Sequence, residues 1–385
     1  MSTTPGIRTK ITDQRLSALR TKVGAPKRRT YEDWELEDAK LLRSHIRSWA
    51  VMLGDMRPLF VDADYAAASP WKTLIAPPSV LSCYEQIDPE VESLPGCQAV
   101  LKSASLEWRL PIRMGDIVTP ESVVTLVNEL SQSAGEGRTV AVEVATEAQN
   151  QDSQVVGRTR MNYLCVERGT AAQRALFGSR LDAHMYSKAD IDALGEEYKQ
   201  ERARGSEPLY WEDVAAGQEL QPVLKGPTTR PKYLGRMIPN WYWGQRQGWE
   251  KYDEVPELFF SNENNAPEPI ASTDWGHHRA QRYGGIPGAL DSNSERIHYL
   301  SHLVMNWMGD HGFMSQMDLQ FSTQNMVGDI TRSYGRVRET RRDGERAVAT
   351  LDVWQENQLG ERVTTGTVQA LLPTRSGAPA IPQGK

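Results

Sequence analysis

Apolar and polar residues alternate along six stretches of the chain, which fall into two groups of three. The stretches are 123–130, 140–148 and 155–165 in the first group, then 332–339, 347–356 and 363–372 in the second. A period of two residues is typical of strands with one buried face, and the Gly- or Asn-bearing turns between them favour hairpins. Each group therefore predicts an antiparallel meander.

A helical pattern precedes each meander. Between Ser294 and Trp307, the residues Ile297, Leu300 and Val304 fall at helical spacing, so one face of this segment is strongly apolar. In the first half, Pro78 opens a shorter pattern that runs to Tyr84. One helix backed by a meander is a single pair of α and β layers, so the pattern predicts an α+β protein.

The two halves repeat one another. Gly115-Asp-Ile117 stands just before the first meander and Gly328-Asp-Ile330 before the second. Asn150-Gln151 is matched by Asn357-Gln358, so the markers recur at a nearly constant separation of roughly 210 residues. At about 100–200 residues per domain, a chain of 385 residues suggests two domains, and the repeat indicates that they arose by duplication.

The predicted organisation has five parts. They are an N-terminal extension (1–29), a first unit (30–168), a linker (169–207), a second unit (208–373) and a flexible tail (374–385). Within the linker, Ser187-Lys-Ala-Asp190 resembles a capping box that opens a helix ending near Gly205.

Composition excludes several classes of protein. The 44 basic and 50 acidic residues give a net charge of −6, which argues against a nucleic-acid binder. Cys83, Cys97 and Cys165 are scattered, without the spacing of a disulfide framework or a zinc site. No apolar run approaches the ~18 residues of a membrane span, and the first twenty residues lack an apolar secretion segment. We therefore expect a soluble, cytoplasmic protein that binds no membrane and no nucleic acid.

Several motifs resemble the MaoC-like (hydratase 2 type) dehydratase family. In the first half these are Gly54-Asp-Met-Arg-Pro58 and Leu74-Ile-Ala-Pro-Pro78; in the second they are Lys225-Gly-Pro227 and Gly285-Ile-Pro-Gly288. The resemblance covers nearly the whole chain apart from the linker and the ends. It implies two tandem hotdog domains, each a long helix wrapped by an antiparallel sheet, that form a pseudo-dimer within one chain.

The resemblance implies hydration of a 2-enoyl thioester or dehydration of a 3-hydroxyacyl thioester. A base must take a proton from water, an acid must protonate Cα, and backbone N–H groups must hold the thioester oxygen. It implies coenzyme A as part of the substrate, no other cofactor, no metal, and assembly as a homodimer or with another hotdog subunit. The open alternatives are a non-catalytic acyl-CoA-binding subunit and a hotdog thioesterase.

Both halves depart from the family motif Gly-Asp-x-Asn-Pro-x-His. In the first half, Asp55 is kept, but Arg57 replaces the Asn and Phe60 replaces the His. A structural role for Asp55 is therefore favoured, with the first unit non-catalytic and shaping the acyl pocket. In the second half, Asp274 stands where the resemblance places the His, and Pro269 stands where it places the Asp.

The candidate catalytic residues are Asp274, His277, His278 and Asp291. The first three bring one carboxylate and two imidazoles into five residues, which suits proton transfer, although a solvated loop is an equal alternative. Asp291 is a candidate replacement acid or base at the start of the long helix. On that helix, His298 and His302 lie four residues apart on one face, where a packing or surface role is favoured.

The candidate substrate-binding residues are Ser292, Asn293, Trp275, Trp243 and Arg57. Backbone N–H groups at Ser292 and Asn293 could hold the thioester oxygen, while a plain helix cap accounts equally well for these residue types. Trp243 belongs to an aromatic-rich stretch, 240–249, which would line a pocket for a bulky or flat acyl group or form a packed cover.

Overall fold

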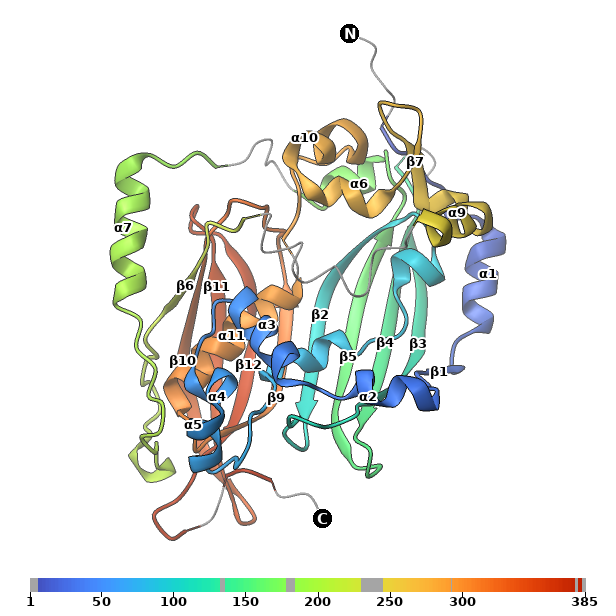
Figure 1. Ribbon diagram of the computed structural model, residues 1–385. Helices are drawn as coiled ribbons and strands as arrows, with labels where there is room; N and C mark the ends of the chain where they lie inside the picture. The colour runs from blue at the N-terminus through green and yellow to red at the C-terminus, as the bar shows by residue number, and fades with distance from the viewer. Residues whose placement is uncertain are drawn as a thin grey trace.

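The computed structural model describes residues 6–131, 136–177, 184–229, 245–291, 293–377 and 380–382. Within these residues, ten strands form one antiparallel sheet with the order β1-β3-β4-β5-β2-β9-β12-β11-β10-β6. Figure 1 shows the two halves of this sheet side by side, meeting where β2 lies next to β9. The predicted α+β class and the organisation into two similar units are confirmed.

Five strands belong to the first half of the chain. They are β1 (Pro26–Arg28), β2 (Gln98–Trp108), β3 (Thr119–Ser131), β4 (Thr139–Gln149) and β5 (Val155–Val166). The last three coincide with the alternating stretches of the sequence. The alternating stretches do not include β2, in which the consecutive residues Val100 and Leu101 are both buried.

The second half repeats this arrangement. Its strands are β6 (Val223–Lys225), β9 (Phe313–Phe321), β10 (Thr331–Asp343), β11 (Arg346–Glu356) and β12 (Arg362–Leu371). β9 pairs with β2, and the Ser105 hydroxyl donates to the Asp318 carboxylate across this pair at 2.6 Å. The junction makes the two meanders one continuous sheet.

The long helix predicted in the second half is α11 (Asn293–Met308). Its residues Ile297, Leu300 and Val304 are almost fully buried and belong to the same core as sheet residues such as Leu351. The apolar stripe read from the sequence therefore packs on the second-half sheet. The face of α11 that carries His298 and His302 is buried as well, beneath a different cover.

The first half has a short helix where the pattern from Pro78 to Tyr84 predicts one. This segment forms the 3-10 helix η2 (Pro78–Cys83), with Pro78 at its first position. Among the described residues, the first half has no counterpart of α11. η2 instead packs against α11 itself.

The cover over α11 comes from the first half of the chain. It consists of α3 (Arg43–Met52), α4 (Pro58–Val61) and α5 (Ala63–Ala68). These helices lie in front of α11 and the second-half sheet in Figure 1, and Leu59 and Phe60 are fully buried in the core that they share with α11. Helices from the first half therefore cover the long helix of the second half.

The linker helix and the chain ends pack onto this framework. The predicted capping box opens α7 (Lys188–Lys199), where the side chains of Ser187 and Asp190 each accept from the other's backbone N–H. In the predicted extension, α1 (Asp13–Thr21) buries Leu16 and Leu19 against the first-half sheet. In the predicted tail, Ala380 and Ile381 are buried.

A smaller module precedes α11 and lies over one end of the first half in Figure 1. It comprises α9 (Gln245–Glu254), β7 (Phe259–Ser261), β8 (Pro267–Pro269) and α10 (His277–Arg279), next to α6 (Ala171–Ala175). Further short helical turns, inside and outside this module, span Asp33–Glu35, Leu36–Ala39, Pro89–Ser93, Trp211–Asp213, Pro256–Leu258, Ile270–Trp275 and Ala280–Gly284. Over the part of the chain that the structure describes, no helix has the length and apolar character needed to cross a membrane.

The two Gly-Asp-Ile motifs form the same type of turn. Gly115 and Gly328 have φ values of 93° and 95°, which favour glycine. In each copy the Asp accepts from the backbone N–H three residues before it, at 2.7 Å for Asp116 and 2.8 Å for Asp329. Its other oxygen accepts from the Gln of the matched Asn-Gln pair. The residues that mark the repeat therefore stabilise a turn rather than form a functional site.

We expect Asp329→Ala to lower the free energy of unfolding by about 2–3 kcal/mol, because it leaves a buried backbone N–H without its acceptor. Asp116→Ala should cost less, since Asp116 is more exposed and its contact with the Gln amide is longer, at 3.4 Å against 2.7 Å. Urea denaturation measures both, with the exposed Asp343→Ala as the control. Equal losses for all three variants would contradict this assignment.

Candidate active site

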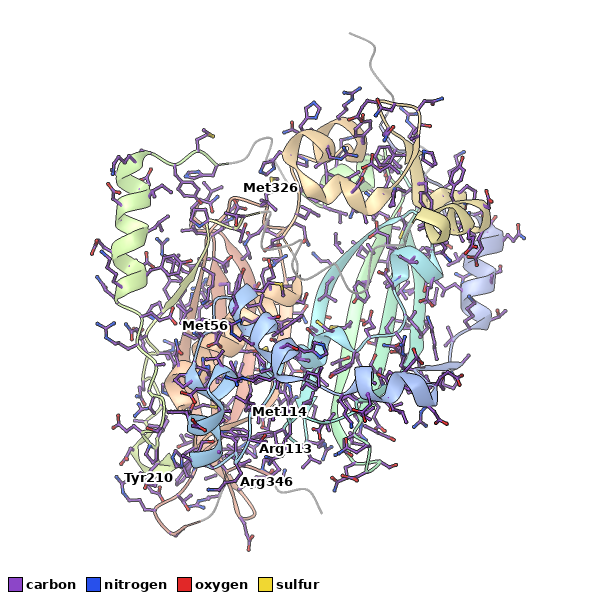
Figure 2. All side chains as sticks on the ribbon, viewed as in Figure 1. Met56, Arg113, Met114, Tyr210, Met326 and Arg346 are labelled. Atoms are coloured by element: carbon purple, nitrogen blue, oxygen red, sulfur yellow. The ribbon has the colours of Figure 1, made fainter. Side chains whose placement is uncertain are left out.

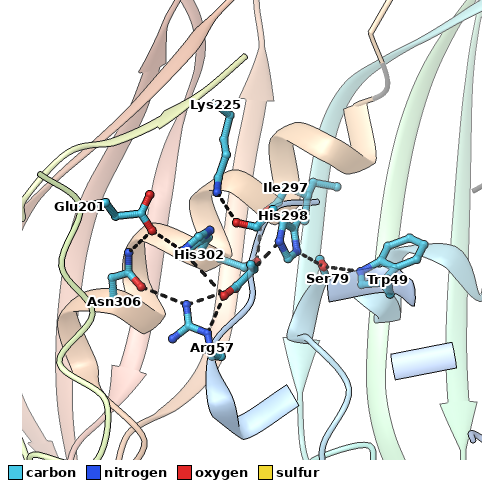
Figure 3. Close-up of polar contacts among 12 residues, drawn as sticks. Trp49, Arg57, Ser79, Glu201, Lys225, Ile297, His298, His302 and Asn306 are labelled. Atoms are coloured by element: carbon cyan, nitrogen blue, oxygen red, sulfur yellow. Dashed lines mark hydrogen bonds and ion pairs between the residues drawn. The ribbon is translucent and has the colours of Figure 1, made fainter. Parts of the chain in front are cut away.

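A cluster of charged and polar side chains lies between α11 and the cover from the first half (Figure 3). Asp55, Arg57, His298 and His302 are 2%, 7%, 1% and 4% exposed. Asp55 and Arg57 come from the turn between α3 and α4, and the two histidines lie one turn apart on α11. Ionisable groups are rarely buried together without a structural or catalytic role.

The turn that carries Asp55 and Arg57 alternates between the interior and the surface. Gly54, with a φ of 66°, ends α3, and the Asp55 N–H donates to the Ala50 carbonyl at 2.9 Å. Pro58 opens α4 at a position where its missing N–H costs nothing. Asp55 and Arg57 consequently point inward, whereas Met56 between them is 51% exposed and lies at the surface (Figure 2).

Asp55 and Arg57 form a two-pronged ion pair. Arg57 donates from Nε to Oδ1 at 2.9 Å and from Nη2 to Oδ2 at 3.1 Å. Burial alone would raise the pKa of the Asp55 carboxyl, but the charge of Arg57 and its hydrogen bonds outweigh burial and hold that pKa below its usual range. Asp55 is therefore a carboxylate at neutral pH. Arg57 Nη2 also donates to Asn306 Oδ1 at 3.1 Å.

The proton on His298 is located by its neighbours. Trp49 Nε1, which can only donate, gives its hydrogen to Ser79 Oγ at 3.1 Å. Ser79 Oγ lies 2.7 Å from His298 Nδ1, so the network is best satisfied when the hydroxyl donates to this nitrogen. The neutral ring then carries its proton on Nε2, which lies 4.0 Å from Asp55 Oδ2 and has no hydrogen-bond partner.

His302 is held by a carboxylate from the linker. Its Nε2 lies 2.8 Å from Glu201 Oε1 and 3.7 Å from Asp55 Oδ1. Although burial raises the pKa of Glu201, its hydrogen bonds with His302 and Asn306 and the charge of Lys225 hold that pKa well below its usual range. An ionised carboxylate can only accept, so Nε2 of His302 carries the proton. Its Nδ1 is buried without a hydrogen-bond partner.

Burial also keeps both histidines neutral. Desolvation lowers the pKa of His298 well below 6.5 and lowers that of His302, in each case against the raising effect of Asp55. The two rings lie 6.2 Å apart. The pair thus presents two unsatisfied atoms of opposite kind, an N–H donor on His298 and a lone pair on His302.

The same three side chains could in principle reach a metal ion. Asp55, His298 and His302 each bring one ligand atom within 4.8 Å of the others. However, Arg57 occupies both carboxylate oxygens of Asp55. The buried Lys225 adds a second positive charge beside the same turn, where its Nζ donates to the Gly54 carbonyl at 2.8 Å. Two fixed cations oppose a divalent ion, so the donor set fits proton exchange better.

An apolar pocket adjoins this cluster. Pro78, which precedes the Ser79 that contacts His298, lies in its wall, and so does Met305, one turn beyond His302 on α11. The other lining residues are also almost all apolar: Trp71, Ile75, Ala76, Pro77, Trp108, Leu110, Pro111, Ile112, Met308, Phe313 and Met314. Such a lining suits a hydrocarbon group rather than a charged one, and the pocket has a free volume of about 30 Å³, so an acyl group would have to widen it.

The residues predicted from the sequence lie in three places. Arg57 belongs to the polar cluster. His277 and His278 lie on α10 in the smaller module, where His277 Nδ1 accepts from the Ala289 N–H at 3.3 Å and His278 is exposed. Asp291 is buried just before α11, with Oδ2 3.4 Å from Arg296 Nε. These three are not brought to Asp55, and their catalytic roles stay predictions.

The remaining predicted residues are described only in part. Ser292 and Trp243 lie outside the described residues, as do the side chains of Asp274, Trp275 and Asn293. The backbone of Asn293 begins α11, which is the position that the helix-cap and oxyanion interpretations both require. The substrate-binding predictions for these residues therefore remain open.

Sequence reasoning favours packing roles for His298 and His302, whereas the structure places both against Asp55. One signal pointed to them: two histidines four residues apart on an otherwise apolar helix, in a chain that keeps the family's Asp. Nothing in the sequence pointed to Glu201, Ser79 or Asn306. These residues reach the cluster through tertiary contacts between the linker, η2 and α11.

Comparisons with known proteins place this fold. Residues 31–159 match the family model described as the FAS1-like dehydratase domain region. A solved structure named MaoC-like dehydratase is similar, with a TM-score of 0.61 at 15% identity over 92% of this chain and 99% of its own. A MaoC domain dehydratase from Chloroflexus aurantiacus J-10-fl gives 0.52 at 10% identity, over 92% and 96%. Among curated protein sequences, none matches significantly.

A conserved hypothetical protein from Mycobacterium tuberculosis, described as having a double hotdog fold, has a TM-score of 0.51 at 13% identity, over 86% of this chain and 92% of its own. The fold therefore defines a tandem double hotdog protein. Within that class, the predicted resemblance to the MaoC-like dehydratases is confirmed, with the family-model match lying in the first unit.

We expect the free energy of unfolding to fall as the pH drops below about 6.5. The folded-state pKa of His298 is lowered, so below its unfolded value the unfolded chain binds a proton that the folded chain does not. The loss reaches about 1.4 kcal/mol per pH unit for each such group. Asp55 and Glu201 also have lowered pKa values, but their contribution is lost only at more acidic pH.

Urea denaturation of the wild type and of His298→Gln, between about pH 7 and about pH 5, measures this slope. The variant should show a shallower loss of stability with falling pH. His45→Gln, at an exposed position outside the cluster, is the control and should keep the wild-type slope. If His298→Gln also kept that slope, His298 would not be neutral in the folded protein.

Proposed function

We propose that this protein is a hydro-lyase that adds water to a 2-enoyl thioester, or removes it from a 3-hydroxyacyl thioester. An acyl-CoA is the expected substrate, with coenzyme A entering only as part of it. The observation that carries the proposal is the buried set of Asp55, His298 and His302, in a fold similar to that of MaoC-like dehydratases. It combines the carboxylate that the first-half motif keeps, Asp55, with imidazoles that both altered motifs lack.

His302 is the proposed base. Its Nδ1 lone pair takes a proton from water while the water oxygen bonds to Cβ and the C=C electrons move toward the thioester oxygen. The resulting imidazolium is stabilised by the carboxylates of Glu201 and Asp55, at 2.8 and 3.7 Å from Nε2. Nδ1 then gives the same proton to Cα, so one water is added and no protein group is changed.

His298 is the proposed donor to the thioester oxygen. Its Nε2–H is unsatisfied, and burial keeps the ring neutral. A neutral imidazole can polarise a carbonyl, and it stabilises the enolate-like oxygen most strongly where water is excluded. Ser79 and Trp49 hold the ring, so the donor is oriented before the substrate binds.

The acyl group is proposed to occupy the apolar pocket. Its wall includes Pro78, the residue before Ser79, and Met305 and Met308 of α11. The cover over the catalytic set is thin, because Gly54, Met56 and Pro58 are exposed while Asp55 and Arg57 beneath them are buried. An acyl group in this pocket and a thioester carbonyl beside His298 would lie on the same side of α11.

Asp55→Asn and His302→Gln should each lower kcat by about 10²–10⁴-fold, since each removes a group that exchanges or stabilises the transferred proton. Turnover is followed by the ultraviolet absorbance of the conjugated enoyl thioester, over a panel of short, long and aromatic enoyl-CoAs. The comparison variant replaces Asp274, His277 and His278 together by Ala. The proposed site predicts that this triple variant keeps most of the activity.

The outcomes separate the alternatives. Loss of activity in the triple variant alone would move catalysis to the smaller module. Binding of acyl-CoA without turnover by the wild type would favour a non-catalytic subunit, and release of free coenzyme A from a saturated acyl-CoA would favour a thioesterase. Either of the last two results contradicts the hydro-lyase proposal.

Changing the pocket wall should change chain-length preference. Met308→Ala enlarges the pocket and Ala76→Leu narrows it, so kcat/KM should shift toward longer acyl groups in the first variant and shorter ones in the second. A shift of about tenfold is expected, because one or two methylene groups in an apolar pocket are worth that much. Met185→Ala, at a fully exposed position, is the control. Unchanged preference in both pocket variants would place the acyl group elsewhere.

A further inference from the structure

The segment after α7 runs along the C-terminal end of α11. The Arg204 N–H donates to the Asn306 carbonyl at 3.0 Å, and Arg204 Nε donates to the Trp307 carbonyl at 2.8 Å. The Asp310 N–H returns a bond to the Gly205 carbonyl at 2.8 Å. This segment, residues 201–205, therefore satisfies carbonyls in the last turn of the helix that carries both histidines.

The helix α7 that leads into this segment is fixed to the second-half sheet. Arg332 forms a two-pronged ion pair with Glu197, with Nε and Nη2 each 2.8 Å from a carboxylate oxygen. The Tyr198 hydroxyl donates to the Gly226 carbonyl at 2.8 Å. The position of Glu201, two residues after the end of α7, is thus set by contacts on both sides of it.

Glu201 completes a closed ring of polar groups (Figure 3). Its Oε1 accepts from His302 Nε2 at 2.8 Å and from Asn306 Nδ2 at 3.1 Å. Asn306 Oδ1 accepts from Arg57, which is paired with Asp55, and Asp55 faces His302 again at 3.7 Å. The first unit, the linker and the second unit each contribute at least one member. Within this ring, His302 has only Glu201 at hydrogen-bond distance.

We propose that Glu201 is a positioning residue: the linker carboxylate fixes the proton of His302 on Nε2 and so leaves Nδ1 as the base. The catalytic meaning of this arrangement rests on the proposed function, but the position of the proton does not. Asp55 cannot replace Glu201 in this task, because its two oxygens are already held by Arg57 and lie beyond hydrogen-bond distance of His302. Without the linker carboxylate, the ring would be free to carry its proton on either nitrogen.

Nitrogen-15 NMR of the full-length protein labelled at histidine tests this assignment, since protonated and unprotonated ring nitrogens have well-separated shifts. The His298→Gln and His302→Gln variants assign the signals. In the wild type, His302 should show a protonated Nε2 and an unprotonated Nδ1. In Glu201→Gln, whose amide can also donate, His302 should become a mixture of both tautomers while His298 stays unchanged.

Glu197→Gln is the matched control, because it removes a carboxylate on α7, one turn before Glu201, that contacts Arg332 and not a histidine. It should leave both tautomers as in the wild type. If Glu201→Gln does not fold, Glu201→Ala, which opens a water-sized space instead, gives the same readout. An unchanged His302 tautomer in a folded Glu201 variant, or a wild-type His302 protonated on Nδ1, overturns the proposal.

Kinetics separate this proposal from the hydro-lyase proposal. If the enzyme turns over an enoyl thioester, Glu201→Gln should lower kcat by about 10–100-fold with KM nearly unchanged, since the tautomer affects proton transfer rather than binding. A response of the His302 tautomer in a protein without turnover would uphold the role of Glu201 while removing the proposed function. Turnover of the enoyl thioester with a His302 tautomer that does not change in Glu201→Gln would remove the role of Glu201 and leave the proposed function standing.

Discussion

The burial of the Asp55–Arg57 ion pair against α11 is the constraint on which the rest of the site depends. Taking two charges out of water is costly, and this is offset only when each remaining polar atom finds a partner. Arg57 saturates the carboxylate and then reaches Asn306, and Asn306 reaches Glu201. The buried pair is thus the start of a chain of hydrogen bonds from Arg57 to Asn306 and Glu201. Ser79 contacts His298 and Glu201 contacts His302.

The duplicated fold brings the parts of this site together. In the first half, the 3-10 helix η2 takes the place of a long helix, and the first-half helices α3 and α4 cover the helix of the other half instead. A motif from one copy and a helix from the other thus meet at one buried site. The Gly-Asp-Ile turns, by contrast, are kept in both copies for local reasons, because a positive φ and a carboxylate acceptor are needed wherever that turn forms.

Much of the fold could be predicted from the sequence, and little of the site. Alternation gave β3, β4, β5 and the second meander, and helical spacing gave α11, because these patterns record burial on one face. Strands β2 and β9 lie outside the alternating stretches, so the junction between the two halves of the sheet was not predicted. Asp55 was visible as a retained motif residue, but its partners were not, since Ser79, Glu201 and Asn306 are separated from it by up to about 250 residues along the chain and join it only through tertiary packing.

A structure of the protein with a non-reactive enoyl-CoA analogue tests the central claim most directly. The account predicts that the thioester oxygen lies within hydrogen-bond distance of His298 Nε2, that Cα and Cβ face His302 Nδ1, and that the acyl group lies along Met305 in the apolar pocket. An analogue bound beside His277 and His278 on α10, with the Asp55–Arg57 turn undisturbed, would contradict it.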